Sequence, residues 1–351
     1  MSKRRLIFSI LSLLTLLPSL AQATCSGIPR VLTVPVNRNL TISGAADANP
    51  VGQQISSWGG TVTELAAFTV DTCRPLAEKS YAIPSQNEIA GLTHQSDGVS
   101  YPVYPTDIPG VGYVLAIKDP NASRWTAISN PQTQIYPGPG TGTGAISTLG
   151  VIAQVKIVAT GRIKAGNYSV PKRKIATLQV TTAGGIVVTS VVPIYLDAFT
   201  LTATTRACSL TQGGTQTVRL PQTSIGTINK VGSGDGSASF SMGLQCDPGV
   251  SVYATMTDVS NPANMGNILS LDRESTATGV GIQLFKFGES TPIKFGPDSS
   301  AIGNSNQWYV DASSASPTLI TIPFVAKYVK NGPNVVPGSV KAQSTITFSY
   351  Q

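Results

Sequence analysis

Short runs of β-branched and aromatic residues recur along almost the whole chain, and they constrain its fold more than any other feature. Their ranges are 31–36, 112–117, 150–158, 175–180, 185–196, 216–220, 238–246, 251–258, 280–287, 318–329 and the C-terminal end. The stretches between them are rich in Gly, Pro, Asn and Ser, and long helical periodicities are absent. Short strands separated by frequent turns are typical of β-sandwiches. The pattern therefore predicts an all-β fold.

The length of 351 residues predicts about two domains after an export segment. Residues 1–23 combine Lys3, Arg4 and Arg5 with an apolar run and an Ala-Gln-Ala ending, which is typical of a secretory signal peptide. The best internal boundary lies in the Thr/Ala-rich segment 197–210, near Ala203. The predicted domains are thus 24–203 and 204–351.

The charge balance gives no indication of a nucleic-acid partner. The formal net charge is +7, and three of these charges lie in the predicted signal peptide, which leaves about +4. A charge of this size does not imply nucleic-acid binding.

Four cysteines in an exported chain predict two disulfides. Three pairings are possible. Pairing within the halves, Cys25 with Cys73 and Cys208 with Cys246, is the simplest if there are two domains.

The sequence favours a non-enzymatic role without cofactor or metal. His94 is the one histidine, so a Ser-His-Asp or Cys-His site would have to use it, and its neighbours have loop composition. The Gly-rich stretch 137–144 lacks the Gly-Lys-Ser/Thr ending of a phosphate loop and predicts a surface loop. Residues 231–237 carry a single carboxylate, Asp235, which favours a turn over a calcium loop.

The C-terminal stretch 338–351 largely alternates between apolar and polar residues. The apolar positions are Val340, Ala342, Ile346, Phe348 and Tyr350. This period of two predicts a half-buried strand that continues almost to the last residue.

This terminal strand and two other stretches resemble the pilin domain of chaperone–usher fimbriae, over roughly 204–351. The other stretches are FSMGLQC, which ends at Cys246, and 279–296. Within the terminal strand, Tyr350 is penultimate and Gly338 is the fourteenth residue from the end. The resemblance implies an incomplete immunoglobulin-like sandwich that lacks its last strand, which a foreign strand fills by β-augmentation. The implied groove residues are Gly338, Val340, Ile346, Phe348 and Tyr350.

The same resemblance implies several partners. They are a periplasmic chaperone, an outer-membrane usher and an adjacent fimbrial subunit that donates a strand.

The first half resembles the receptor-binding domain of a two-domain tip adhesin. Cys25 is the second residue of the predicted mature chain, so we expect no free strand to donate onward. The cysteine spacing and IPGVGYVL at 108–115 are similar to the type 3 fimbrial adhesin class. The implied function is attachment to a host glycan or matrix-protein receptor from the tip of a fimbria. Two alternatives are a subunit that caps or initiates the pilus without binding a receptor, and a hydrolase on a pilin anchor, which the lone histidine disfavours.

Aromatic residues in polar or Pro/Gly-rich segments are the candidate receptor contacts, because such rings stack on ligands in shallow sites. We predict Tyr101, Arg124, Trp125 and Tyr136, with Trp58 and Tyr104 as further aromatic candidates. Each could instead be a half-buried packing residue. A second candidate is a basic stretch that could meet acidic glycans, or could simply be a solvated hairpin. Its residues are Arg162, Lys164, Lys172, Arg173 and Lys174.

Overall fold

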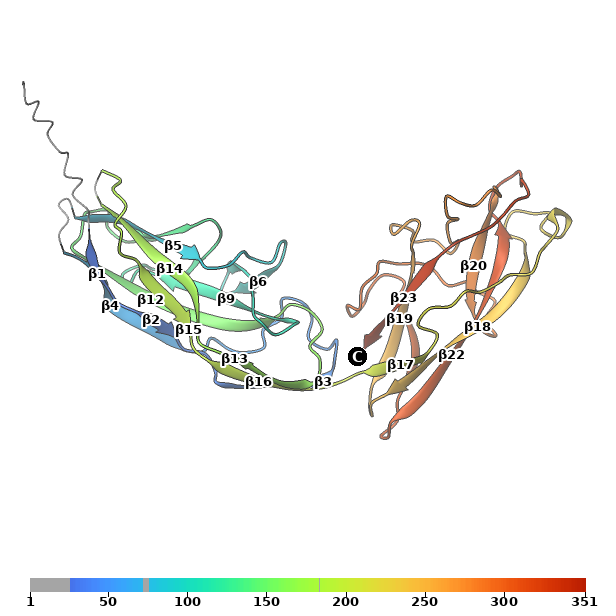
Figure 1. Ribbon diagram of the computed structural model, residues 1–351, viewed down its shortest axis with the longest axis horizontal. Coiled ribbons are helices and arrows are strands. Elements are labelled where there is room, and N and C mark those ends of the chain that lie inside the picture. Colours follow the sequence, from blue (N-terminus) through green and yellow to red (C-terminus); the bar gives the residue numbers. More distant parts are fainter. Residues whose placement is uncertain (1–25, 72–75, 183) are drawn as a thin grey trace, which may run out of the picture.

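A computed structural model describes residues 26–71, 76–182 and 184–351 (Figure 1). These residues form β-strands joined by turns and loops, with a 3-10 turn (η1) at Ile225–Thr227 and no α-helix among them. None of the described segments is a helix long and apolar enough to span a membrane. The predicted signal peptide and the predicted Cys25–Cys73 pair lie outside the described residues. The all-β prediction is confirmed.

The N-terminal domain is a sandwich of two sheets with a shared core. One sheet has the order β1-β4-β12-β9-β10 with β8 paired to β9, and the other has the order β11-β5-β14-β15-β2. The strands of the first sheet are β1 Gly27–Pro29, β4 Thr61–Val70, β8 Tyr104–Pro105, β9 Val111–Lys118, β10 Thr126–Ala127 and β12 Thr148–Ala159. Those of the second are β2 Leu32–Val34, β5 Ala77–Pro84, β11 Thr133–Tyr136, β14 Arg173–Thr182 and β15 Val192–Leu196.

Further elements of this domain are a small sheet of order β13-β16-β3 and a hairpin, β6-β7. Their bounds are β3 Asn39–Ala45, β6 Thr93–Ser96, β7 Val99–Pro102, β13 Gly166–Val170 and β16 Phe199–Arg206. The alternating apolar side chains of β12 and β14 face each other in the core. Each large side chain buried there stabilises the sandwich by about 1.5–3 kcal/mol.

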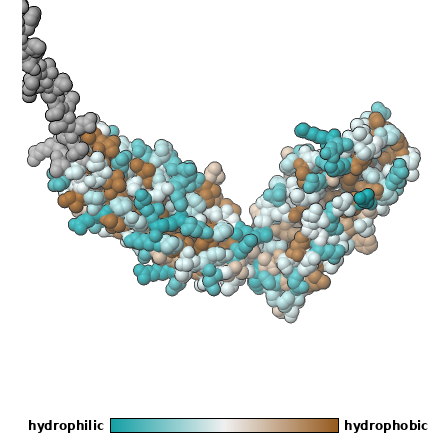
Figure 2. All heavy atoms as spheres, viewed as in Figure 1, coloured by the Kyte–Doolittle hydropathy of each residue, from teal (hydrophilic) through white to brown (hydrophobic). Residues whose placement is uncertain are grey.

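The C-terminal domain is a second sandwich, with sheet orders β17-β18-β22-β20 and β21-β19-β23. The first sheet contains β17 Cys208–Gln212, β18 Gly234–Cys246, β20 Val280–Lys286 and β22 Thr318–Lys330. The second contains β19 Ser251–Asp258, β21 Trp308–Ala312 and β23 Ser344–Tyr350. Its core includes the fully buried rings of Phe295 and Phe324. The chain's two lobes meet at a narrow junction (Figures 1 and 2).

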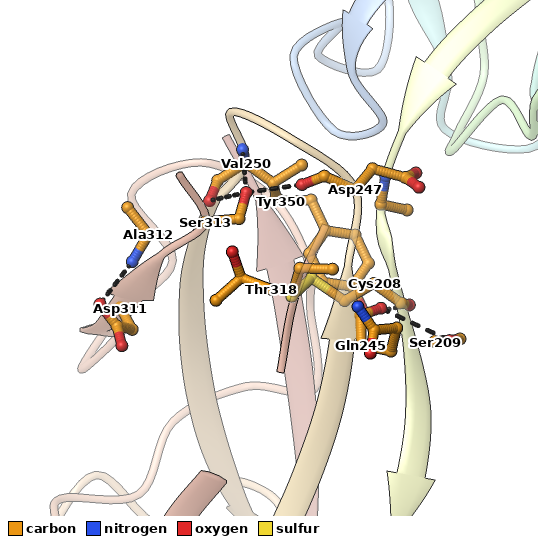
Figure 3. Close-up of a disulfide and its surroundings, with 12 residues drawn as sticks. Cys208, Ser209, Gln245, Asp247, Val250, Asp311, Ala312, Ser313, Thr318 and Tyr350 are labelled. Carbon is orange, nitrogen blue, oxygen red and sulfur yellow. Dashed lines mark hydrogen bonds between the residues drawn. A yellow bond between two sulfur atoms is a disulfide. The ribbon is translucent and has the colours of Figure 1, made fainter. Parts of the chain in front are cut away.

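A disulfide joins the first two strands of the C-terminal domain (Figure 3). Cys208 and Cys246 lie directly opposite each other in the β17–β18 ladder and are bonded. The predicted pairing of these two cysteines is confirmed. The Tyr350 hydroxyl donates to the Cys208 carbonyl at 3.0 Å, so β23 and β17 are linked beside the bridge.

Three of the predicted strands differ from the structure. Residues 185–191 form a turn and bends before β15, and 216–220 runs without a strand partner, although Val218 and Leu220 pack against the core. The C-terminal strand begins at Ser344 rather than near Gly338, because residues 339–341 bond instead to the loop at 272–277. In the last two cases the apolar residues are half-buried as predicted, but a strand also needs a neighbour for its main chain. In the first case the apolar pattern is wrong about burial as well, because Ile186 and Val187 are each 50% exposed.

The two domains are joined without a loose linker. β16 continues past Ala203 to Arg206 in parallel pairing with β3, and β17 begins at Cys208. Ala207 exchanges hydrogen bonds with Asp247, through the Asp247 main chain and carboxylate. We therefore propose Ala207 as the division between the domains.

Candidate functional site

A hollow of about 720 Å³ opens on the N-terminal domain. One wall is the turn after β9, and the other is the Gly-rich loop between β11 and β12. Its lining is Leu65, Asp119, Pro120, Asn121, Tyr136, Gly140, Thr141, Gly142, Thr143, Gly144, Ile146, Thr148 and Gly150. The combination of a carboxylate, an amide, hydroxyls and an aromatic ring is suited to a small polar ligand.

Asp119 organises the first wall. Its side chain is buried, and Oδ1 accepts from the Asn121 main chain at 2.8 Å. The Ala122 amide donates to the Asp119 carbonyl, and Lys118 Nζ donates to the Ala122 carbonyl at 3.2 Å. The turn is therefore held in shape from within. The exposed Asn121 side chain is left at the surface of the hollow.

The Gly-rich loop is folded onto this turn. The Ser123 amide donates to the Pro139 carbonyl, and the Tyr136 hydroxyl donates to the Gly144 carbonyl at 2.8 Å. Gly140 has φ of +81°, in the region that favours glycine, and a Cβ there would meet the Ser123 side chain. Gly142 has open space around it. Sequence reasoning predicted a surface loop here but missed its part in a hollow.

The hollow lies far from the domain junction. Gly110, just before β9, is packed against the main chain of Arg162, which contacts the C-terminal domain. The hollow is at the other end of β9, beyond Lys118. At a rise of about 3.3 Å per residue, the two ends of β9 are roughly 23 Å apart, and this separates the hollow from the junction.

The structure separates the four predicted receptor contacts. Tyr136 lines the hollow, and Arg124 is exposed just after its first wall. The Trp125 ring is half-buried in a small second core, with Lys118 Nζ 5.2 Å from its centroid. The Tyr101 side chain is 1% exposed and packs against Trp58, so its ring is not accessible for stacking on a ligand.

The other aromatic candidate, Tyr104, is also buried. Its hydroxyl donates to the Ile128 carbonyl at 2.8 Å, and its ring stacks on Tyr113. Burial raises the pKa of Tyr113 to about 12, although Arg173 acts in the opposite direction. Both rings are therefore packing residues.

The predicted basic stretch is divided between structural roles. Arg173 contacts Asp107 at 2.9 Å and the Pro105 carbonyl at 2.6 Å, while Lys172 lies over the Tyr195 ring. Arg162 binds Asp47 at the junction. Lys172, Lys164 and Lys174 are exposed.

His94 is buried in the β6–β7 hairpin, opposite Tyr101. Its Nδ1 is 2.8 Å from the Gly52 carbonyl, and the ring is buried. Nearby, Lys156 Nζ donates to Gln54 and Ser96, and burial lowers the pKa of its ammonium while Asp97 opposes that shift. The described residues contain no group of three His, Cys, Asp or Glu that could hold a metal.

β23 is an edge strand with a free side. Gln351 and Ser251 exchange both main-chain hydrogen bonds. Because such pairs alternate along an antiparallel ladder, the main-chain groups of Tyr350, Phe348 and Ile346 point away from β19. No strand in the part of the chain that the structure describes pairs with this side. We call it the open edge of β23.

β17 is the corresponding edge of the other sheet. Half-buried apolar side chains on and near these two edges pack against the core without being covered by it. They are Val218, Leu220, Val340, Ala342, Ile346 and Phe348. A strand edge beside uncovered apolar side chains is a template for pairing with another chain.

Gly338 is needed for a close approach rather than for a special backbone angle. A Cβ there would lie 2.4 Å from Thr276 Oγ1 and 2.5 Å from the Ala277 amide. Ser339 then bonds to the same loop, with its amide donating to Thr276 Oγ1 at 2.8 Å. Gly338 therefore fixes where the chain enters the stretch leading to β23.

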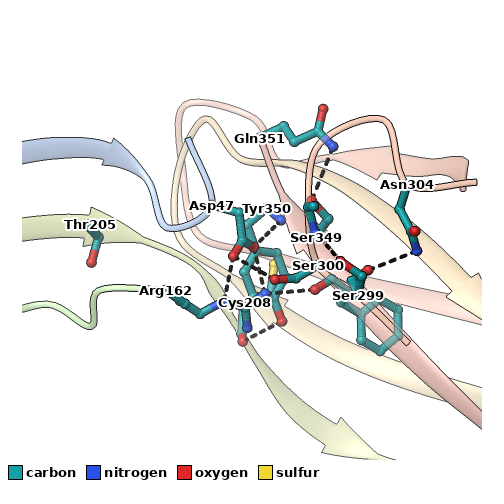
Figure 4. Close-up of polar contacts among 12 residues, drawn as sticks. Asp47, Arg162, Thr205, Cys208, Ser299, Ser300, Asn304, Ser349, Tyr350 and Gln351 are labelled. Carbon is teal, nitrogen blue, oxygen red and sulfur yellow. Dashed lines mark hydrogen bonds and ion pairs between the residues drawn. The ribbon is translucent and has the colours of Figure 1, made fainter. Parts of the chain in front are cut away.

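The end of the open edge is occupied by the N-terminal domain (Figure 4). Asp47 Oδ2 accepts from the Tyr350 amide at 2.9 Å, and the Asp47 amide donates to the Tyr350 carbonyl at 3.2 Å. Arg162 binds both Asp47 oxygens, at 2.8 and 2.6 Å, and donates to the Phe348 carbonyl at 2.8 Å. Ser300 donates to Asp47 Oδ1 at 3.1 Å. We call Asp47, Arg162, Ser300 and Tyr350 the junction cluster.

Asp47 and Tyr350 are shielded from water at the centre of the cluster, while the Arg162 side chain remains 35% exposed. Asp47 is 8% exposed, and the Arg162 guanidinium lies 4.7 Å from the centroid of the Tyr350 ring. Burial alone disfavours the charge on Arg162, but hydrogen bonds to Asp47 and its charge outweigh burial and raise the pKa of Arg162. Burial raises the pKa of Tyr350 as well. Ala46, next to Asp47, packs into the core of the C-terminal domain.

The model of a family described as "Fimbrial protein" matches residues 198–351, which contain both open strand edges. The F17d-G fimbrial adhesin of Escherichia coli is 38% identical over 247 residues, which cover 69% of this chain and 71% of that protein. The chain belongs to the fimbrial adhesin family. A fimbrial adhesin is a surface protein of fimbriae, and the class is non-enzymatic.

Further similarities to this adhesin are weaker. A fimbria adhesin protein of Klebsiella pneumoniae is 26% identical and covers 86% of each chain. The solved structure of the ambient temperature fimbriae adhesin AtfE of Proteus mirabilis is 23% identical, with a TM-score of 0.42, and covers 50% of this chain and 98% of that one. The F17d-G adhesin is the more similar of these relatives in sequence.

Proposed function

We propose that this adhesin sits at the tip of a fimbria, with its N-terminal domain binding a receptor and its C-terminal domain accepting a strand from another protein. The anchoring half rests on one observation, which is that the unpaired edges of β17 and β23 flank uncovered apolar side chains. An added strand would supply both the missing main-chain partners and the missing cover. A periplasmic chaperone would supply that strand during export, and a neighbouring subunit would supply it after passage through the outer-membrane usher.

The tip position is supported by the strand that precedes β17. β16 is already paired with β3 and β13 inside the N-terminal domain. The stretch ahead of the C-terminal domain is therefore not free to complete another subunit. Such a chain accepts a strand from another subunit but does not donate β16 onward. Its part in attachment is not enzymatic.

The receptor-binding half rests on the hollow. Asn121, Thr143 and the Gly-rich main chain offer several donors and acceptors within one small depression at the far end of the domain, and the buried Asp119 holds the turn that presents Asn121. Hydroxyl-rich ligands such as terminal sugars satisfy groups of this kind, and Tyr136 adds an aromatic surface. We propose a host glycan as the receptor and this hollow as its site.

The test is binding of the purified adhesin to glycan and matrix-protein arrays. We expect Asn121→Ala with Thr143→Ala, and separately Gly142→Tyr, to weaken binding about 10-fold or more, since one hydrogen bond to a ligand is worth about 1–1.5 kcal/mol. Both sites are exposed and Gly142 has open space, so folding should be kept.

The matched control is Lys172→Ala with Lys174→Ala in the basic stretch, which should leave binding unchanged. Loss of binding in this control, with full binding by Gly142→Tyr, would place the receptor site at the basic stretch instead. An adhesin that binds nothing on the arrays, from bacteria whose attachment does not need it, would favour a capping subunit.

A further inference from the structure

The open edge of β23 has a definite end. Along this edge the outward main-chain groups belong to alternate residues, ending at Ile346, Phe348 and Tyr350. At Tyr350 both the amide and the carbonyl are already bonded to Asp47. At Phe348 the carbonyl is bonded to Arg162, while the amide has no such contact with the junction cluster.

Asp47 bonds to the main chain of Tyr350 in the way that a residue of an added strand would. Its amide and its carboxylate reach Tyr350 from the side that a neighbouring strand would occupy. An added strand that continued to Tyr350 would meet these same two groups. It would have to displace Asp47, and thereby separate it from Arg162 and Ser300.

We propose that Asp47 is a stop for the incoming strand: the N-terminal domain closes the end of the open edge, so that a complementing strand pairs with β23 as far as Phe348 and no further. This inference rests on the proposed strand-accepting function and adds what limits it. The partner surface is then the stretch from Val340 to Phe348. The domain junction stays intact when the strand is bound.

The stop has a structural basis on both sides of the junction. β3 and β16 run in parallel register to Ala45 and Arg206, and the Ala46 amide donates to the Arg206 carbonyl at 2.9 Å. The pairing of β3 with β16 therefore fixes the position of Asp47 relative to β17, which follows β16 in the chain. Ser300, from the C-terminal domain, holds the same carboxylate from its other side.

The first test measures amide hydrogen exchange in the unaltered adhesin. The probe is a designed peptide with Val at alternate positions and Thr between them. We expect the Tyr350 amide to be protected before the peptide is added and to stay so, while the Phe348 and Ile346 amides become protected at least 10-fold on binding. Fast exchange at Tyr350 in the free adhesin would overturn the stop.

The second test compares two such peptides, one long enough to span Val340–Phe348 and one lengthened by two residues to reach Tyr350. In the unaltered adhesin, we expect the two affinities to agree within about 2-fold. In Asp47→Ala, the longer peptide should bind about 10-fold more tightly than the shorter one, because two main-chain bonds become available. Asp298→Ala removes a carboxylate that contacts Thr347 away from the edge, and should leave the ratio unchanged.

The outcomes separate the two proposals. The stop is overturned if the longer peptide binds the unaltered adhesin about 10-fold more tightly than the shorter one, or if it has no advantage over the shorter one in Asp47→Ala. Either result leaves the strand-accepting function in place. If neither peptide binds the unaltered adhesin, the strand-accepting function fails and the stop fails with it. Because the exchange measurement needs no variant, a poorly folded Asp47→Ala would still leave the stop open to refutation.

Discussion

Phe348→Asp is expected to weaken binding of a complementing strand at least 100-fold, which corresponds to about 2.8 kcal/mol. The Phe348 side chain is half-buried against the core of the C-terminal domain, on the face that an added strand would cover. A carboxylate there would be taken out of water by the strand without a partner, which is costly. The measurement is titration of the adhesin with the alternating Val/Thr peptide, followed by its thermal unfolding.

The matched control for this variant is Thr345→Asp, which places the same charge on the exposed face of the same strand. It should bind the peptide as the unaltered adhesin does. In Thr345→Asp and in the unaltered adhesin, a bound strand with a net gain of about 3 kcal/mol should raise the unfolding temperature of the C-terminal domain by about 10 °C, while in Phe348→Asp the added strand should raise it little. The incomplete fold would be contradicted by a stable monomer whose unfolding temperature does not change when any strand peptide is added.

Replacing Cys208 and Cys246 together by Ser is expected to lower the free energy of unfolding of the C-terminal domain by about 4 kcal/mol. The bridge spans a sequence separation of 38 residues, and closing a loop of that length restricts the unfolded chain by about this amount. It also fixes the start of β17, to which the Tyr350 hydroxyl is bonded. The variant should therefore lose part of its strand affinity as well as stability.

Urea unfolding of the oxidised adhesin measures this effect. Ser209→Ala is a suitable comparison, because Ser209 is exposed on β17 beside the bridge and should change stability by no more than about 0.5 kcal/mol. A loss below about 1 kcal/mol in the Cys208/Cys246 double variant would mean that the ladder alone holds β17 in place.

The strands that could be predicted are those in which consecutive residues already show an apolar run or an apolar–polar alternation. β19 occupies the predicted range 251–258, and β9, β12, β18, β20 and β22 overlap theirs closely, because each is a long apolar or alternating run. Residues 216–220 show a shorter alternation of the same kind but form no strand. Their side chains find the core, while their main chain finds no neighbour in the described structure. Composition reports the first condition and is silent on the second.

The receptor site shows the same limit from another direction. Tyr101 and Tyr136 look alike in the sequence, each near polar or Pro/Gly-rich residues, yet one is enclosed by Trp58 and the other lines the hollow. The hollow exists because the loop 137–144 folds onto the turn at 119–123. Neither segment is unusual alone, so no local pattern could have identified the pair.

The sequence by itself determined the all-β class and the apolar face of the last strand, since both depend on residues close together in the chain. It favoured the Cys208–Cys246 bridge as part of the simplest of three possible pairings. Tertiary structure alone decided which main-chain groups of that strand remain open. Asp47 and Tyr350 are 303 positions apart, and they meet because β3 and β16 carry one domain onto the edge of the other. Because main-chain hydrogen bonds alternate along β23, the main-chain groups of Ile346 point away from β19 and stay open, whereas those of Tyr350 are bonded to Asp47. The pattern of side chains in the sequence predicts neither.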